Sequence, residues 1–319
     1  MILNNFTTRA PSRGVRWARR LVGAALLAGS WLASGEALAG ASPTKIVAIG
    51  AENEYANVIA QIGGRYVEAS AIMSNPTTDP HTFEASPSVA RQVSSARLIV
   101  QNGVGYDTFM GRLEQASPSS HRKVIVVQNL LGLPTDTPNP HLWYKPATAP
   151  KVAVAVEADL AAIDPAHAGY FAARLRAFQS SIVTLDATIA NFKRQFAGRT
   201  VATTEPVADY LLSALGLDNL TPFRFQADIM NGVDPSPQDV SFQDQLFTKH
   251  KVKMFCYNAQ VVSPVTRSLL ALARSSHVPV VAVYETMPTP GYDFQTWMAA
   301  EIGAFHKALV SRVSTSTLL

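Results

Sequence analysis

The chain has 319 residues, of which 47% are hydrophobic and 16% are charged, and its formal net charge is +4. This is the composition of a globular protein long enough for two lobes, and it excludes a disordered or fibrous chain. The single cysteine, Cys256, excludes an internal disulfide and a thiolate metal cluster.

The first 39 residues have the pattern of a secretory signal peptide. Five arginines precede an apolar stretch over residues 21–33, and Ala37-Leu38-Ala39 forms a small-x-small cleavage site. The apolar stretch is short for a membrane span, and no cysteine stands at the cleavage site to carry a lipid. We therefore expect residues 1–39 to be removed and the mature protein to be periplasmic, without a lipid anchor.

Removal of this segment changes the charge of the protein. The segment carries five Arg and one Glu, so 27 − 5 = 22 basic and 23 − 1 = 22 acidic residues remain. A mature chain without formal net charge offers no electrostatic case for a nucleic-acid partner.

From residue 45 onward, short apolar runs alternate with helical patterns. Strands are predicted at residues 45–50, 67–73, 98–101 and 124–127, and helices at 54–62 and 86–96. Strands separated by single helices indicate a parallel sheet covered on both faces. We expect residues 40–163 to form an N-terminal α/β lobe.

A long helical pattern begins at Asp164-Pro165 and continues to about Phe196, before Gly198. Apolar residues recur in it every three or four positions, which predicts one amphipathic helix of about 32 residues, roughly 48 Å long. Because that length exceeds one small lobe, we expect residues 164–197 to join two lobes as a single rigid helix.

The alternation resumes after this helix. Strands are predicted at residues 200–204, 252–257 and 279–284, and helices at 207–215, 236–250, 263–276 and 294–313. We expect residues 198–319 to form a C-terminal α/β lobe. The predicted fold class is therefore α/β, with two lobes that are each a parallel sheet flanked by helices.

Two histidines follow prolines in turn-like segments, and two glutamates follow predicted strands. His81 stands in Asp79-Pro80-His81 and His141 in Asn139-Pro140-His141, where proline stiffens the loop that presents each imidazole. Glu205 and Glu285 come directly after strands of the second lobe. Because ligands bind beyond the carboxyl ends of parallel strands, these four side chains predict a metal site between the lobes.

The donor set restricts the choice of metal. Two imidazoles and two carboxylates suit zinc in a four-coordinate site, and with bidentate carboxylates they suit manganese or ferrous iron. The general order of affinity favours zinc slightly. Asp293 is the alternative to Glu285 as the fourth ligand.

Five segments of the chain resemble those of a known family. The segments are DPHTFEASP, NPHLWY, TTEPVADYLL, DPSPQDV and ETMPTPGY. Over residues 45–310 the chain is similar to the metal-binding receptors of bacterial zinc/manganese ABC importers, the cluster A-I solute-binding proteins. The resemblance implies two α/β lobes joined by one long rigid helix, and a divalent metal ion held by His81, His141, Glu205 and Glu285. It also implies delivery of the ion to a membrane ABC permease, and we expect a monomer.

The sequence departs from this family in three respects. Lys145 stands where relatives often have an acidic or neutral residue, so the charge near His141 differs. No His-rich acidic loop stands between the two histidine motifs, and the third ligand position is Glu205, where many zinc receptors have histidine. The alternative function is a secreted metal-dependent hydrolase, with Glu52 or Glu54 as general base. Because four protein ligands would close the site to water, and neither H-E-x-x-H nor G-x-S-x-G is present, we predict a binding protein and not an enzyme.

Overall fold

The first lobe is built on a parallel four-stranded sheet. The computed structural model describes residues 44–75 and 83–318, and the predicted signal peptide lies outside them. The strand order is β2-β1-β3-β4. The strands are β1 (Ile46–Glu52), β2 (Val67–Met73), β3 (Leu98–Gln101) and β4 (Lys123–Val126). The helices of this lobe are α1 (Asn53–Gly63), α2 (Pro87–Ser95), α3 (Thr108–Ala116), α4 (Val127–Leu130) and α5 (Thr148–Ile163), with 3-10 turns at Gly64–Tyr66 and Leu142–Tyr144.

The second lobe repeats this arrangement. Its parallel sheet has the order β6-β5-β7-β8. The strands are β5 (Thr200–Thr203), β6 (Asp218–Asn219), β7 (Met254–Asn258) and β8 (Val280–Val283). The helices are α7 (Asp209–Ala214), α8 (Phe223–Met230), α9 (Pro237–Thr248), α10 (Pro264–Ser275) and α11 (Phe294–Ser311).

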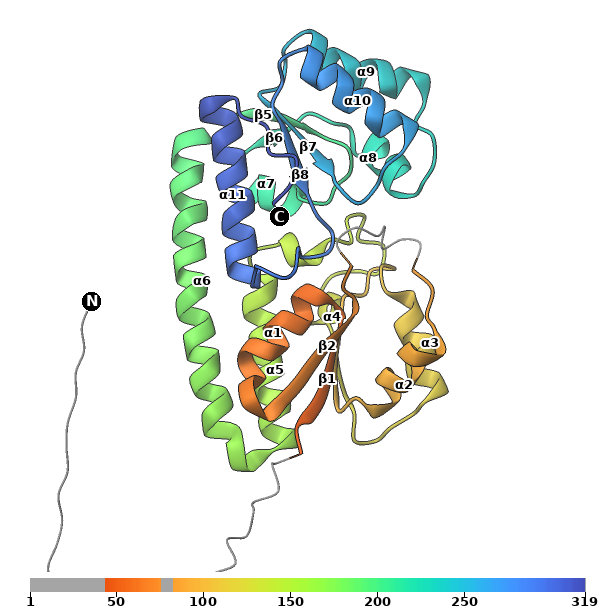
Figure 1. The fold of residues 1–319 in the computed structure, drawn as a ribbon, viewed down its shortest axis with the longest axis vertical. Coiled ribbons are helices and arrows are strands. Elements are labelled where there is room, and N and C mark those ends of the chain that lie inside the picture. Colours follow the sequence, from red (N-terminus) through yellow and green to blue (C-terminus); the bar gives the residue numbers. More distant parts are fainter. Residues whose placement is uncertain (1–43, 76–82, 319) are drawn as a thin grey trace, which may run out of the picture. The chain divides into compact units, whose positions relative to one another are not determined.

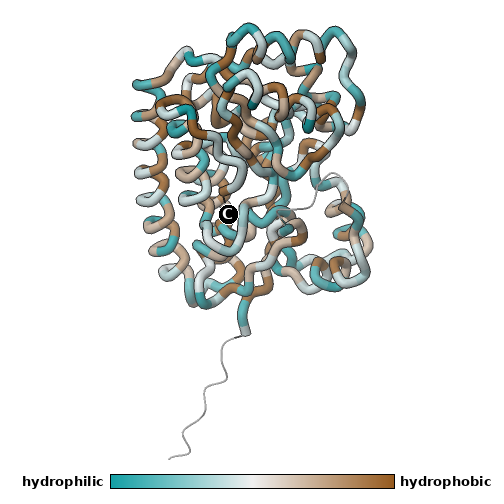
Figure 2. The backbone as a smooth tube through the Cα atoms, turned by 45° about the horizontal axis from the view of Figure 1, so that its top comes forward, coloured by the Kyte–Doolittle hydropathy of each residue, from teal (hydrophilic) through white to brown (hydrophobic). Residues whose placement is uncertain are grey.

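Alternate residues of β1 enter different hydrophobic clusters, because side chains of a strand point to opposite faces. In β1, Ile49 and Ala51 pack with Phe109 of α3, whereas Ile46 and Ala48 belong to a larger cluster. Figure 2 shows that the apolar segments gather in the interior. Both faces of each sheet are therefore covered, as the apolar runs in the sequence predict.

The larger cluster is continuous between the lobes. It contains Ala48 and Val100 of the first sheet together with Val201 and Val281 of the second. The long helix α6 (Ala168–Phe196) runs through this region beside α5 and α11 (Figure 1), and its buried apolar residues belong to the same cluster. The two-lobe α/β fold joined by one long helix is confirmed, while the predicted lobe boundaries stay a prediction.

Serine–proline pairs mark the starts of three helices, as predicted. The hydroxyl groups of Ser86, Ser236 and Ser263 each accept a backbone N–H three residues further on. Proline at the next position fixes φ where its missing N–H is not needed.

Several elements lack a clear signal in the sequence. They are α3, α5, α8 and the short strand β6, none of which was predicted. In α5, the run of valine and alanine over residues 152–156 alternates as a strand does, so the period of the pattern is ambiguous. The long helix is also shorter than predicted, because Pro165–His167 forms a separate 3-10 turn before α6 begins at Ala168.

No helix within the two described ranges is both long enough and apolar enough to span a membrane.

A proline substitution in α6 tests how much this helix contributes to stability. Val183 is 66% exposed and lies in the middle of α6. Val183→Pro removes a backbone hydrogen bond and clashes with the preceding turn, so it should lower the free energy of unfolding by about 3 kcal/mol or more. Val183→Ala should change it by less than about 0.5 kcal/mol. Urea unfolding of both variants measures the difference, and equal stabilities would show that α6 does not hold the lobes.

Candidate metal centre

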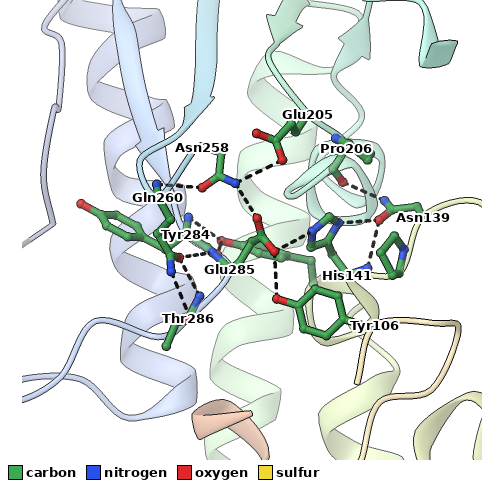
Figure 3. Close-up of polar contacts among 12 residues, drawn as sticks. Tyr106, Asn139, His141, Glu205, Pro206, Asn258, Gln260, Tyr284, Glu285 and Thr286 are labelled. Atoms are coloured by element: carbon green, nitrogen blue, oxygen red, sulfur yellow. Dashed lines mark hydrogen bonds and ion pairs between the residues drawn. The ribbon is translucent and has the colours of Figure 1, made fainter. Parts of the chain in front are cut away.

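The candidate site lies where loops after the strands of both sheets meet. Asn258 ends β7, and the segments after β5 and β8 carry Glu205 and Glu285, while Tyr106 and His141 come from the first lobe (Figure 3). Of these residues, Asn258, Glu205, Glu285 and His141 are buried. The carboxyl ends of parallel strands meet at one edge of a sheet, which explains how distant segments converge here.

His141 has a defined tautomer. Its Nδ1 lies 2.8 Å from Oδ1 of Asn139. The Asn139 amide is oriented in turn, because its Nδ2 donates to the carbonyl oxygen of Pro206 at 2.8 Å. Nδ1 of His141 is therefore the protonated nitrogen, and Nε2 presents its lone pair to the site. This is the arrangement in which a second residue orients a metal-binding imidazole.

Glu285 faces this lone pair. Its Oε2 lies 3.4 Å from Nε2 of His141 and accepts a hydrogen bond of 2.8 Å from the Tyr106 hydroxyl group. Its Oε1 accepts from Nδ2 of Asn258. Residues of both lobes therefore orient this carboxylate.

The loop that carries Glu285 is held from both lobes. Oε1 of Gln260 accepts the backbone N–H groups of Glu285 and Thr286 at 2.7 and 2.8 Å. From the first lobe, the Asn53 side chain donates to the carbonyl oxygen of Met287 and accepts its N–H, at 2.8 and 2.9 Å. Paired bonds of this kind leave the loop little freedom to change its conformation.

Glu205 joins the same network through Asn258. Oδ1 of Asn258 accepts the N–H of Gln260 at 3.0 Å, which orients Nδ2 toward both carboxylates. Nδ2 lies 3.2 Å from Oε2 of Glu205 and also donates to Glu285. The Asn258 amide therefore donates to both buried carboxylates, which reduces the repulsion between them.

Three of the four predicted ligands lie in one hydrogen-bonded network, but they do not all contact one another. His141 and Glu285 are in contact, and Glu205 reaches Glu285 through Asn258, but His81 lies outside the described residues. Within those residues, no three His, Cys, Asp or Glu side chains converge closely enough to enclose an ion. Asp293 is not part of this group, because its carboxylate caps α11 by accepting the N–H of Thr296 at 2.8 Å.

Further buried acidic groups lie at the start of α1. Burial raises the pKa of Glu54 to about 8, and the negative charge of Glu285 adds to this effect. Burial, together with the charges of Asp107 and Glu54, raises the pKa of Glu52 well above its ordinary value. Both groups therefore favour the neutral form at neutral pH. Their complete enclosure does not fit the role of a general base that meets water.

A second hydrogen-bonded link joins the lobes beside the site. The Tyr144 hydroxyl group lies 2.6 Å from Oε1 of Glu301 and 2.9 Å from the carbonyl oxygen of Tyr284. Nε1 of Trp297 donates to the same Glu301 oxygen at 3.0 Å. Burial raises the pKa of Glu301 to about 8. A neutral Glu301 can donate a hydrogen bond to the hydroxyl oxygen of Tyr144. The single proton of that hydroxyl group can then be donated to the carbonyl oxygen of Tyr284.

Sequence reasoning missed the residues that orient the ligands. Tyr106, Asn139, Asn258 and Gln260 make the contacts described above, yet none of them was predicted. Asn258 ends a strand and Asn139 precedes the Pro-His pair. Polar residues at such positions are the signal that could have identified both.

The chain is similar to known proteins in sequence and in fold. Residues 51–308 match the family described as "Zinc-uptake complex component A periplasmic". The structure of the solute-binding protein FpvC from Pseudomonas aeruginosa in complex with Mn2+ is similar, with a TM-score of 0.68 and 19% identity over 84% of this chain and 99% of that chain. The periplasmic zinc-binding protein TroA from Treponema pallidum has a TM-score of 0.68 and 18% identity, over 85% of this chain and 100% of that chain. Both likenesses show the fold.

The Gln260 amide provides a test of how the Glu285 loop is held. Gln260→Met keeps the approximate size of the side chain but removes the acceptor for two buried N–H groups. The free energy of unfolding should fall by about 2–4 kcal/mol. Thr286→Val removes only the contact of 3.2 Å between Gln260 and the Thr286 hydroxyl group, and should cost about 1 kcal/mol. Denaturant unfolding of metal-free protein compares the two variants, and similar losses would contradict the role of the paired acceptor.

Glu301 provides a test of stability against pH. Its pKa is about 8 in the folded protein, above the ordinary value of 4.5. Between these values the unfolded chain releases a proton that the folded protein keeps, so stability falls as pH rises from about 5 to 8. Glu301→Gln removes this contribution, and its stability relative to the native protein should rise by about 1 kcal/mol per pH unit. Parallel pH profiles of metal-free native protein and variant in urea unfolding would contradict a neutral Glu301.

Proposed function

Because the chain belongs to the family of periplasmic zinc-uptake components, we propose that His81, His141, Glu205 and Glu285 hold the divalent metal ion that it captures. Members of this family are substrate-binding proteins and not enzymes, and the hydrolase alternative is not supported. The ion is the cargo of the protein.

The distance between His141 and Glu285 carries the proposal. A zinc ion binds nitrogen and oxygen ligands at about 2.0–2.1 Å, so two ligands at the tetrahedral angle lie about 3.3 Å apart. Nε2 of His141 and Oε2 of Glu285 are 3.4 Å apart, and both side chains are fully buried. The pair therefore has the spacing of two ligands of one metal ion.

The surrounding contacts support the same proposal. Asn139 holds His141 in the tautomer that leaves Nε2 able to bind a metal, and Tyr106 and Asn258 orient the Glu285 carboxylate. Metal sites generally depend on such outer contacts. Binding would complete the set with Glu205, by a change of its side-chain conformation, and with His81.

Zinc and manganese are the proposed cargo. Two imidazoles and two carboxylates bind zinc with four ligands, and they bind manganese when the carboxylates are bidentate. Sites with nitrogen and oxygen ligands generally bind zinc more tightly than manganese. We further propose that the mature protein is a periplasmic monomer, that residues 1–39 direct its export, and that it delivers the ion to an ABC permease.

Substitution of the ligands tests the site. His81→Ala, His141→Ala, Glu205→Ala and Glu285→Ala should each weaken zinc and manganese binding at least about tenfold, because each removes a direct ligand. Competition binding with elemental analysis of the bound metal measures the affinity and identifies the preferred ion.

Asp293→Ala is the matched control. It removes a helix cap and should lower stability by about 1 kcal/mol while leaving metal affinity unchanged. A loss of affinity in Asp293→Ala with normal affinity in Glu285→Ala would reverse the assignment of the fourth ligand.

A further inference from the structure

A basic hollow lies on the second lobe, away from the candidate metal centre. It has a volume of about 230 Å³, and four of its lining residues, His250, Lys253, His277 and Arg312, have nitrogen-bearing side chains. Lys253 directly precedes β7, and residues 278–279 of the lining precede β8. The hollow is thus at the amino ends of these strands, whereas the metal centre lies beyond their carboxyl ends.

Three of these residues have an unusual backbone. Within the described ranges, four residues other than glycine have a positive φ: Val104, His250, His277 and Arg312. The last three all line the hollow, with φ values of 50°, 56° and 54°. Side chains with a Cβ rarely adopt this left-handed conformation, and such positions are concentrated at functional sites.

Other helices of the protein end without a histidine at the corresponding left-handed position. Gly132, Gly216 and Gly232 occupy the same place two residues after α4, α7 and α8, each with a positive φ. His250 and His277 stand two residues after α9 and α10. Glycine is the usual residue for this place because it has no Cβ to strain. The ends of α9 and α10, which border the hollow, instead carry imidazoles.

The helix ends themselves need nothing from these side chains. After α9, the N–H groups of His250 and Lys251 donate to the carbonyl oxygens of Phe247 and Leu246. After α10, the N–H groups of His277 and Val278 donate in the same way to Arg274 and Ala273. The backbone closes both helices through the bonds of a Schellman motif.

The charge of the hollow selects the kind of ligand. Its lining contains Lys253 and Arg312 and no acidic residue. The side chains of all four nitrogen-bearing residues are exposed, and among the described residues they form no hydrogen bond or ion pair. Two fixed positive charges disfavour a metal cation between the imidazoles and favour an anion. The volume equals that of several water molecules at about 30 Å³ each, which suits a hydrated oxyanion.

We propose that this hollow is a binding site for an oxyanion of the phosphate class, contacted by His250, Lys253, His277 and Arg312. The imidazoles and the two cationic groups donate hydrogen bonds to the anion. Three of the positions carry a residue other than glycine in the left-handed conformation, because glycine would remove these donors.

The test is thermal unfolding of the metal-free full chain with and without inorganic phosphate, with sodium chloride at equal ionic strength as reference. Phosphate at saturating concentration should raise the Tm of the native protein by a few degrees. His250→Gly and His277→Gly relieve the left-handed strain, so each should raise the Tm without phosphate by roughly 2 °C. The same variants should lose most of the phosphate-dependent shift.

Lys249→Ala is the matched control, because Lys249 is an exposed neighbour that bonds to Gln245 and does not line the hollow. It should keep the phosphate shift, and Lys253→Ala should lose it. A native Tm unaffected by phosphate, or an equal shift in all variants, would overturn the proposal. So would a second bound zinc ion that His250→Gly and His277→Gly remove.

A flotation assay with phosphatidylglycerol vesicles identifies the source of the anion. Phosphate binding without vesicle binding assigns a soluble anion. Vesicle binding that His277→Gly abolishes, together with the phosphate shift, assigns a lipid headgroup.

Discussion

The candidate metal centre depends on the acidic groups that are buried around it. Among the described residues, the buried side chains include seven carboxyl groups and neither lysine nor arginine, and Asp239 pairs with the exposed Arg224. Burial raises the pKa of Glu54 and Glu301 to about 8, so protons neutralise these two. Glu205 and Glu285 instead share the amide of Asn258. At the proposed site, a divalent cation beside them would compensate their negative charge.

The shared hydrophobic core makes this arrangement possible. It runs from Ala48 in the first sheet to Val281 in the second, with α6 packed along it, so the carboxyl ends of both sheets stay close together. Contacts such as Asn53 with Met287 then hold loops of one lobe against the other. A core of this extent favours small movements of the loops over wide separation of the lobes, because opening would expose apolar surface.

Much of the fold could be predicted because hydrophobic periodicity is a local signal. The strands at Ile46–Glu52 and Val280–Val283 and the starts of the helices after Ser86, Ser236 and Ser263 follow from apolar runs and caps. α5 was missed because alternating valines fit two periods. The end of the long helix near Phe196 was predicted correctly, but its start was displaced by a 3-10 turn whose stability depends on local packing.

The sequence by itself determined the fold class, most of the strands and the residue types that serve as candidate ligands, because strand and helix periods and Pro-His pairs are properties of neighbouring residues. Only the tertiary structure showed that Glu285 faces His141 and that Asp293 caps α11. It also decided the His141 tautomer through Asn139 and Pro206, and the buried state of Glu54. These depend on contacts between residues far apart in the chain, as Asn53 and Met287 are at 234 positions, and no local pattern encodes such contacts.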